Sequence, residues 1–115
     1  MVTKAEMRKF KEEAVDYIYI LVDPRDSALR YVGRTYFPKL RLEGHIADAR
    51  QEQTANSRKK EWINDLVSQG INPLLVVIEE ADQSISPLRE AYWVNLLIEN
   101  GADLLNGVRC LVKST

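Results

Sequence analysis

The order of apolar and polar positions along the chain indicates three strands. Residues 16–22 form an apolar run rich in β-branched and aromatic side chains, which predicts a strand covered on both faces. Turn-forming residues follow at 23–27, so we expect residues 30–35 to return as an antiparallel second strand. A continuous apolar run at 74–79 predicts a third strand, also buried on both faces.

Apolar residues at helical spacing indicate helices in the remaining segments. The first is predicted over residues 3–14. The second begins at Pro38, because the missing N–H of proline costs nothing in a first turn, and it runs to about residue 50. Residues 51–56 have no apolar period, which is typical of a loop.

Two further helices are indicated by their terminal residues. Ser57 is expected to cap a helix that Gly70 ends, and Ser86 is expected to cap another helix that Gly101 ends. Pro87 suits the first turn of this last helix. The acidic residues between the third strand and this helix are expected in a loop, and they are Glu79, Glu80 and Asp82.

Length and pattern together predict one small domain. The 115 residues are 45% hydrophobic, which is enough for a single core. We therefore expect one α/β (α+β) domain over residues 1–115, in which a small three-stranded antiparallel sheet is flanked by helices. An N-terminal helix within residues 1–15 would precede a core at 16–107.

Composition indicates the cellular setting. Residues 1–15 are charged, unlike a signal peptide, and no long apolar run follows. The single cysteine, Cys110, has no partner for an internal disulfide. We expect a soluble cytoplasmic (intracellular) protein with no membrane partner.

Charge is distributed unevenly along the chain. The net charge is −1, but residues 1–60 hold 13 Lys and Arg against 9 Asp and Glu, whereas residues 61–115 hold 3 against 8. The first half should therefore present a local basic surface, with modest, salt-sensitive affinity for DNA.

Four polar side chains are predicted to meet at one edge of the sheet. Tyr19 and Tyr31 lie on neighbouring predicted strands, and Arg41 and His45 share one face of the following helix. Two phenols, a guanidinium and an imidazole in one cluster suggest chemistry on a phosphate group.

These residues lie within a series of short motifs that resembles the GIY-YIG endonuclease family. The motifs are Tyr17-Ile18-Tyr19, Tyr31-Val32-Gly33, the Arg41 and His45 pair, and segments 56–63, 90–94 and 104–106. Together they cover roughly residues 16–107 in the order that the family has. One departure is that Tyr17 stands where the family name has its first glycine.

The resemblance implies a catalytic set made of Tyr19, Tyr31, Arg41, His45 and Glu90. In this set Tyr19 or His45 would be the general base, and the sequence leaves that choice open. The unperturbed pKa of histidine, about 6.5, would suit His45 as a proton relay. Arg41 would hold the scissile phosphate, and Tyr31 would orient water or phosphate.

Three further residues are implied in supporting roles. Gly33 would allow backbone and substrate to approach closely, and Arg34 would add positive charge. Asn106 would position the region around Glu90 by hydrogen bonding.

Glu90 begins an apolar helix stripe, so its carboxylate must find a cation or take up a proton. That cation could be Arg34 or Arg41, while the resemblance favours a divalent metal. A single Mg²⁺ held by Glu90 and water, with Mn²⁺ as a substitute, fits the habits of these ions.

Three consecutive cations stand at the predicted start of the third helix, and they are Arg58, Lys59 and Lys60. This is the unfavourable end of a helix for positive charge. They are interpreted either as a solvated turn or as a site for a DNA phosphate.

The expected function is therefore a divalent-metal-dependent endonuclease that hydrolyses DNA in repair or in a phage or mobile element. Other nuclease designs fit poorly, because His45 is the only histidine and no Asp-x-Lys or Glu-x-Lys occurs. Two alternatives stay open on the same fold: a non-cleaving, structure-sensing DNA-binding module and a protein-interaction domain. A partner protein could supply target specificity.

Overall fold

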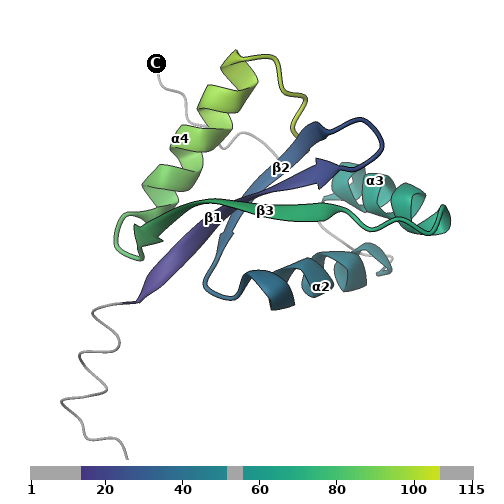
Figure 1. The fold of residues 1–115 in the computed structure, drawn as a ribbon, viewed down its shortest axis with the longest axis horizontal. Coiled ribbons are helices and arrows are strands. Elements are labelled where there is room, and N and C mark those ends of the chain that lie inside the picture. The colour runs from purple at the N-terminus through teal and green to yellow at the C-terminus, as the bar shows by residue number, and fades with distance from the viewer. Residues whose placement is uncertain (1–13, 52–55, 107–115) are drawn as a thin grey trace, which may run out of the picture.

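The computed structural model describes residues 14–51 and 56–106, which form three strands and three helices (Figure 1). In chain order the elements are β1 (Val15–Asp23), β2 (Ala28–Thr35), α2 (Pro38–Ala49), α3 (Ser57–Ser68), β3 (Leu74–Asp82) and α4 (Ser86–Glu99). The antiparallel open sheet with helices confirms the predicted α+β class. The helix expected over residues 3–14 lies outside the described residues. Within those residues, every helix is too short or too polar to cross a membrane.

The central element is β1, and its predicted burial on both faces is confirmed. The strand order is β2-β1-β3, and both neighbours pair with β1 in antiparallel register. Four consecutive residues of β1, Ile18 to Leu21, are at most 6% exposed. A strand with partners on both edges and helices on both faces has no side open to water, so every one of these side chains can be apolar.

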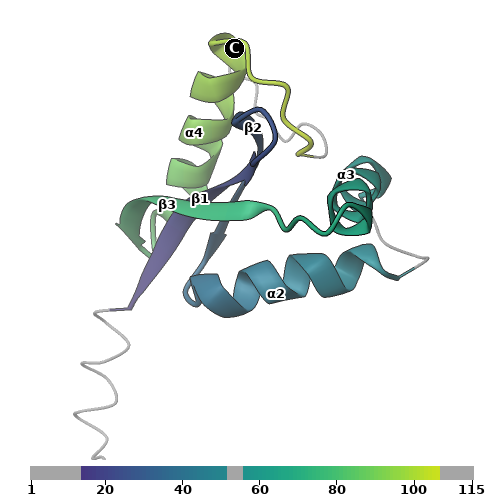
Figure 2. The same cartoon turned by 45° about the vertical axis from the view of Figure 1, so that its right-hand side comes forward.

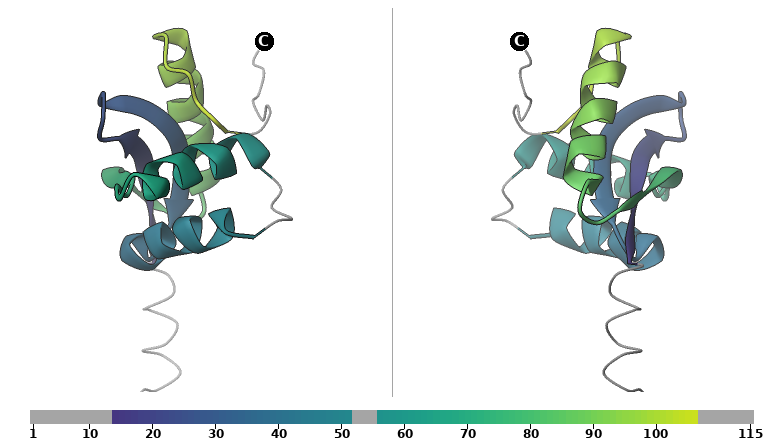
Figure 3. Two further views of the ribbon diagram at one scale, coloured as in Figure 1. Left: turned by 90° about the vertical axis from the view of Figure 1, so that its right-hand side faces the viewer. Right: turned by 90° about the vertical axis from the view of Figure 1, so that its left-hand side faces the viewer.

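Helices cover the two faces of the sheet separately. Helices α2 and α3 lie side by side on one face, and α4 lies on the other (Figure 2 and Figure 3). Because side chains alternate along a strand, Tyr19 and Leu21 pack towards α3, while Ile18 and Ile20 pack towards Val94 of α4. The protein therefore has two apolar clusters separated by the sheet.

The prediction that the third strand is buried on both faces is wrong. Strand β3 pairs only with β1, and Leu74, Val76 and Val77 are 51%, 45% and 44% exposed. A continuous apolar run gives the same signal in a central strand and in an edge strand, because composition does not report how many neighbours a strand has.

The acidic residues expected in a loop instead belong to β3, which pairs with β1 as far as Asp82. Glu79 accepts hydrogen bonds from Arg89 Nε (2.7 Å) and Trp93 Nε1 (2.7 Å), and these bonds lower the pKa of its carboxyl. This carboxylate therefore attaches α4 to the edge of the sheet.

The prediction that Ser57 and Ser86 cap their helices is wrong, because the residue before each serine is the N-cap. The N-cap of α3 is Asn56, whose Oδ1 accepts a hydrogen bond from the Lys59 N–H at 3.0 Å. The N-cap of α4 is Ile85, so Ser86 lies inside the helix. Its hydroxyl is buried and donates to Asp16 Oδ2 at 2.5 Å, which joins α4 to β1. As predicted, Gly70 and Gly101 follow their helices with positive φ.

Substituting Ser86→Ala should lower the free energy of unfolding by about 1–3 kcal/mol, because the buried Asp16 carboxylate loses a hydrogen-bond donor. The matched control is Ser84→Ala, which removes a hydroxyl bonded to the exposed Asp82 carboxylate and should cost less than about 0.5 kcal/mol. Urea unfolding of both variants measures the difference. Equal losses would contradict the anchoring role of Ser86.

Candidate active site

A short hydrogen bond links the central strand to α2. The Tyr19 hydroxyl lies 2.6 Å from Nε2 of His45, and both side chains are buried, at 1% and 0% exposed. Their rings meet edge to face, with centroids 5.8 Å apart. The structure thus brings together the two residues between which the sequence left the role of general base open.

Gly33 makes this contact possible. It is the partner of Tyr19 in the register of β1 with β2, and a Cβ at this position would overlap the Tyr19 hydroxyl. The missing side chain leaves room for the phenol to cross β2 towards α2. The close approach that Gly33 allows in this structure is that of the Tyr19 ring.

Lys59 and Tyr31 complete the surroundings of His45. Lys59 Nζ lies 3.0 Å from His45 Nδ1 and 4.6 Å from the centre of the Tyr31 ring. The Tyr31 ring meets the imidazole edge to face, with centroids 5.2 Å apart. Lys59 is thus a member of the cluster, where the sequence showed it only as one of three cations in a turn.

The placement of Lys59 depends on the start of α3. Asn56 caps this helix and also donates from Nδ2 to the Leu105 carbonyl at 2.7 Å, which holds the first turn against the C-terminal segment. Neighbouring Arg58 points elsewhere and lies 3.7 Å from Asp103 in an exposed ion pair. No local sequence signal separates Lys59 from Arg58 and Lys60, because only the tertiary position of α3 does so.

Arg41 lies one helical turn before His45 on α2, so both side chains project from the same face. Its positive charge acts on three members of the cluster: it lowers the pKa of His45, of Lys59 and, against other causes, of Tyr19. The predicted grouping of Tyr19, Tyr31, Arg41 and His45 is therefore present on the face that α2 and α3 cover.

Burial and charge keep the Tyr19 and His45 side chains neutral at physiological pH. Burial raises the pKa of Tyr19 above its ordinary value, with a smaller contribution from Tyr31. Burial, followed by the charges of Lys59 and Arg41, lowers the pKa of His45 to about 3. The pKa of His45 therefore lies well below the unperturbed value that would suit a proton relay, because the imidazole is buried and faces two positive charges.

A second group lies on the α4 face, next to β2. Arg34 follows Gly33 in β2, and its Nε lies 2.9 Å from Glu90 Oε1. Arg34 Nη1 also lies 4.0 Å from Asp16 Oδ2, so this guanidinium stands between two carboxylates. Of the partners that the sequence left open for Glu90, the structure shows Arg34. Sequence reasoning did not single out Asp16.

The two groups are close enough to interact electrostatically. The negative charge of Glu90 contributes to raising the pKa of Tyr19. The Ile18–Arg34 and Tyr19–Gly33 pairs are adjacent in the register, so Arg34 and Tyr19 belong to opposite faces of the sheet. Glu90 therefore approaches the tyrosine cluster from across β2.

Asn106 has a different partner from the predicted one. Its Oδ1 accepts from the Val32 N–H at 3.0 Å, and its Nδ2 donates to the Val32 carbonyl at 2.8 Å. The amide therefore pairs with the outer edge of β2 like one residue of a further strand. It fixes the backbone between Tyr31 and Gly33.

The carboxylates next to Arg34 have the chemistry that Mg²⁺ prefers. This ion takes oxygen ligands, keeps several waters and needs only one or two carboxylates, and Glu90 and Asp16 are the carboxylates that lie against Arg34. In the part of the chain that the structure describes, no group of three or more His, Cys, Asp or Glu side chains gathers as a larger site.

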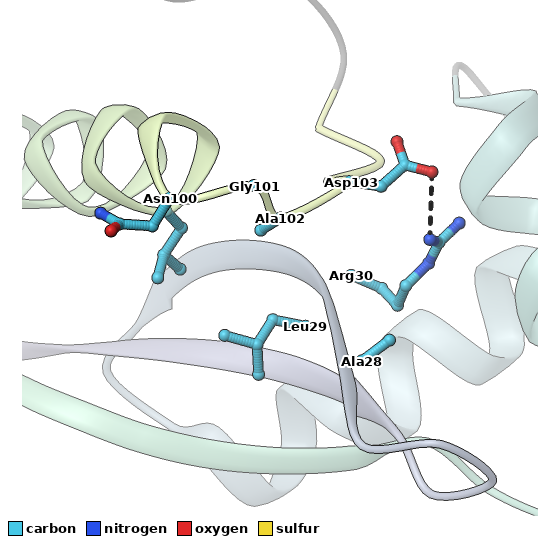
Figure 4. Close-up of a pocket in the computed structure, with 8 residues that line it drawn as sticks. Ala28, Leu29, Arg30, Asn100, Gly101, Ala102 and Asp103 are labelled. Atoms are coloured by element: carbon cyan, nitrogen blue, oxygen red, sulfur yellow. Dashed lines mark hydrogen bonds and ion pairs between the residues drawn. The ribbon is translucent and has the colours of Figure 1, made fainter.

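An open pocket of about 390 Å³ lies beside the far half of β2, between this strand and the end of α4 (Figure 4). Arg30 and Asp103 line it and form an ion pair of 3.2 Å. None of its lining residues belongs to the cluster around Tyr19, so this pocket is separate from the candidate site.

Comparison of the chain with protein family models, with curated proteins and with solved structures finds no match.

The lowered pKa of His45 predicts that acid destabilises the fold. The unfolded chain would take up a proton near pH 6.5, while folded His45 stays neutral to about pH 3. The unfolded state therefore binds more protons between these values, and stability falls as pH drops, by up to about 1.4 kcal/mol per pH unit. Urea unfolding at several pH values, with NMR titration of this single histidine, measures the effect.

The control is His45→Gln, which keeps a polar side chain but cannot titrate. Its stability should depend less on pH than that of the wild type over the same window. Parallel pH curves for the two proteins, or an imidazole that titrates near 6.5, would contradict the assignment.

Proposed function

We propose that this chain is a divalent-metal-dependent endonuclease of GIY-YIG type that hydrolyses DNA phosphodiester bonds. The observation that carries the proposal is the 2.6 Å contact between Tyr19 and His45 inside a cluster that also holds Arg41 and Lys59. The order of motifs in the sequence supports it. Hydrolysis needs an activated water, stabilisation of negative charge on phosphorus and help for the leaving oxygen.

Arg41 is assigned to the scissile phosphate. Its planar guanidinium can donate to two phosphate oxygens at once, and its charge already acts on Tyr19 and His45. A phosphate bound there would place anionic oxygens next to the phenol and would offset the excess of positive charge around the imidazole. Tyr31 is assigned to orienting the water or the phosphate.

Tyr19 is assigned as the general base. His45 is assigned as the hydrogen-bond donor that stabilises the deprotonated form of Tyr19. A protonated Lys59 can only donate, so its contact with Nδ1 requires the neutral imidazole to carry its proton on Nε2. That Nε2–H then donates to the Tyr19 oxygen. A donor aimed at the phenol oxygen stabilises the phenolate that must form before Tyr19 can take a proton from water.

Glu90 would hold Mg²⁺ or Mn²⁺, with Asp16 beside it and Arg34 as their partner in the absence of metal. When bound, such an ion polarises phosphate oxygens and stabilises the leaving alkoxide. Arg34 would then be released towards the DNA backbone, to which the exposed Arg58 and the neighbouring Lys60 are also assigned.

Substituting Arg41→Ala or Glu90→Ala should lower DNA cleavage by about 10²- to 10³-fold, because each removes charge stabilisation from the transition state. Nicking of a supercoiled plasmid with Mg²⁺, and with EDTA as the blank, measures the loss.

Matched controls are Arg50→Ala and Glu99→Ala, exposed residues near the ends of the same two helices, which should cleave like the wild type. Wild-type rates in either site variant would refute the role of that residue. DNA retention without Mg²⁺-dependent nicking by the wild type would favour a non-cleaving DNA-binding module.

The pH dependence of cleavage separates the two candidate bases. Because the pKa of Tyr19 is raised, its phenolate fraction should increase about tenfold per pH unit between about pH 6 and about pH 9, and the single-turnover rate should follow. If His45 were the base, its pKa of about 3 would leave the rate flat over this range. A flat profile, or substantial activity in Tyr19→Phe, would assign the base role elsewhere.

A further inference from the structure

Two aromatic rings stand exposed beside the candidate active site. Tyr36 is 69% exposed and Phe37 is 55% exposed, and both lie in the connection between β2 and α2. Their rings meet edge to face, with centroids 6.3 Å apart. Leu40, one turn into α2, is 56% exposed. Exposing this much apolar surface is costly unless something covers it.

The connection is held in place by its own hydrogen bonds. The Phe37 N–H donates to Thr35 Oγ1 at 3.0 Å, and the Phe37 carbonyl accepts from the Arg41 N–H at 3.0 Å. Pro38 fixes its own backbone in the first turn of α2. The two rings are therefore presented by a constrained backbone, one helical turn from the guanidinium assigned to the scissile phosphate.

The charge around the rings is entirely positive in sequence. Residues 27–42 contain no Asp or Glu, and Lys39 and Arg41 follow the aromatic pair, while Arg34 before it is paired with Glu90. Cations interleaved with exposed aromatic rings are the arrangement by which proteins bind single-stranded nucleic acid: the cations follow the phosphates, and the bases stack on the rings. A protein or lipid partner would account for the apolar surface but not for the basic side chains of Lys39 and Arg41 next to it in the chain.

We propose that Tyr36 and Phe37 form a stacking platform for unpaired bases, so that the substrate is DNA with a single-stranded segment next to the cleaved bond. Bases inside a duplex are already stacked on their neighbours, and only unpaired bases have a free face for an external ring. The position of the single-stranded segment next to the cleaved bond rests on the proposed nuclease function. The binding of unpaired bases to the two rings does not require cleavage.

The experiment compares two strands that differ only in their bases. Fluorescence anisotropy in EDTA measures binding of an oligothymidine of about 20 nucleotides and of a tetrahydrofuran abasic strand of equal length. The wild type should bind oligothymidine more tightly. Tyr36→Ala and Phe37→Ala should each weaken oligothymidine binding at least about fivefold and leave abasic-strand binding unchanged.

Three controls separate stacking from other effects. Tyr36→Phe keeps the ring and should bind like the wild type. Tyr92→Ala removes an exposed tyrosine from α4 and should change nothing. Lys39→Gln removes a charge and should weaken both strands equally. Equal wild-type affinity for the two strands, unchanged binding in the alanine variants, or equal loss on both strands would each overturn the proposal.

Plasmid nicking with Mg²⁺, run on the same preparations, distinguishes the two proposals. Nicking by the wild type together with alanine variants that bind both strands normally would overturn the stacking platform and leave the nuclease standing. Ring-dependent binding of oligothymidine without nicking would overturn the nuclease and leave the platform standing.

Discussion

The hydrogen bond between Tyr19 and His45 connects the centre of the sheet to α2, and the other site residues are arranged around it. It exists because Gly33 leaves β2 without a side chain where the phenol has to cross. Once the two rings meet in a buried place, Lys59 can approach the second imidazole nitrogen and Arg41 can act on both groups. One missing Cβ thus determines the geometry of the cluster.

Burying these groups together has an electrostatic consequence. The imidazole is surrounded by the charges of Lys59 and Arg41 in a dry environment, which holds its pKa far below the usual range. An excess of positive charge next to neutral hydrogen-bonding groups is a suitable setting for an anion. The connection before α2 carries the exposed Tyr36 and Phe37 one helical turn ahead of Arg41 in the chain.

On the other face of the sheet, hydrogen bonds that hold α4 determine where Glu90 lies. Ser86 and Glu79 fasten α4 to β1 and β3, and this places Glu90 opposite Arg34. The carboxylate then acts on Tyr19 from across β2. Residues that fix the helix therefore also set the position of Glu90 relative to β2.

The sequence by itself determined the three strands and the approach of Tyr19, Tyr31, Arg41 and His45, because strand alternation and helical spacing are local properties. Only the tertiary structure decided that β3 is an exposed edge, that Lys59 turns inward while Arg58 does not, and that Asn106 pairs with Val32. It also decided the pKa of His45. These features depend on which distant groups surround a residue, and no local pattern records that.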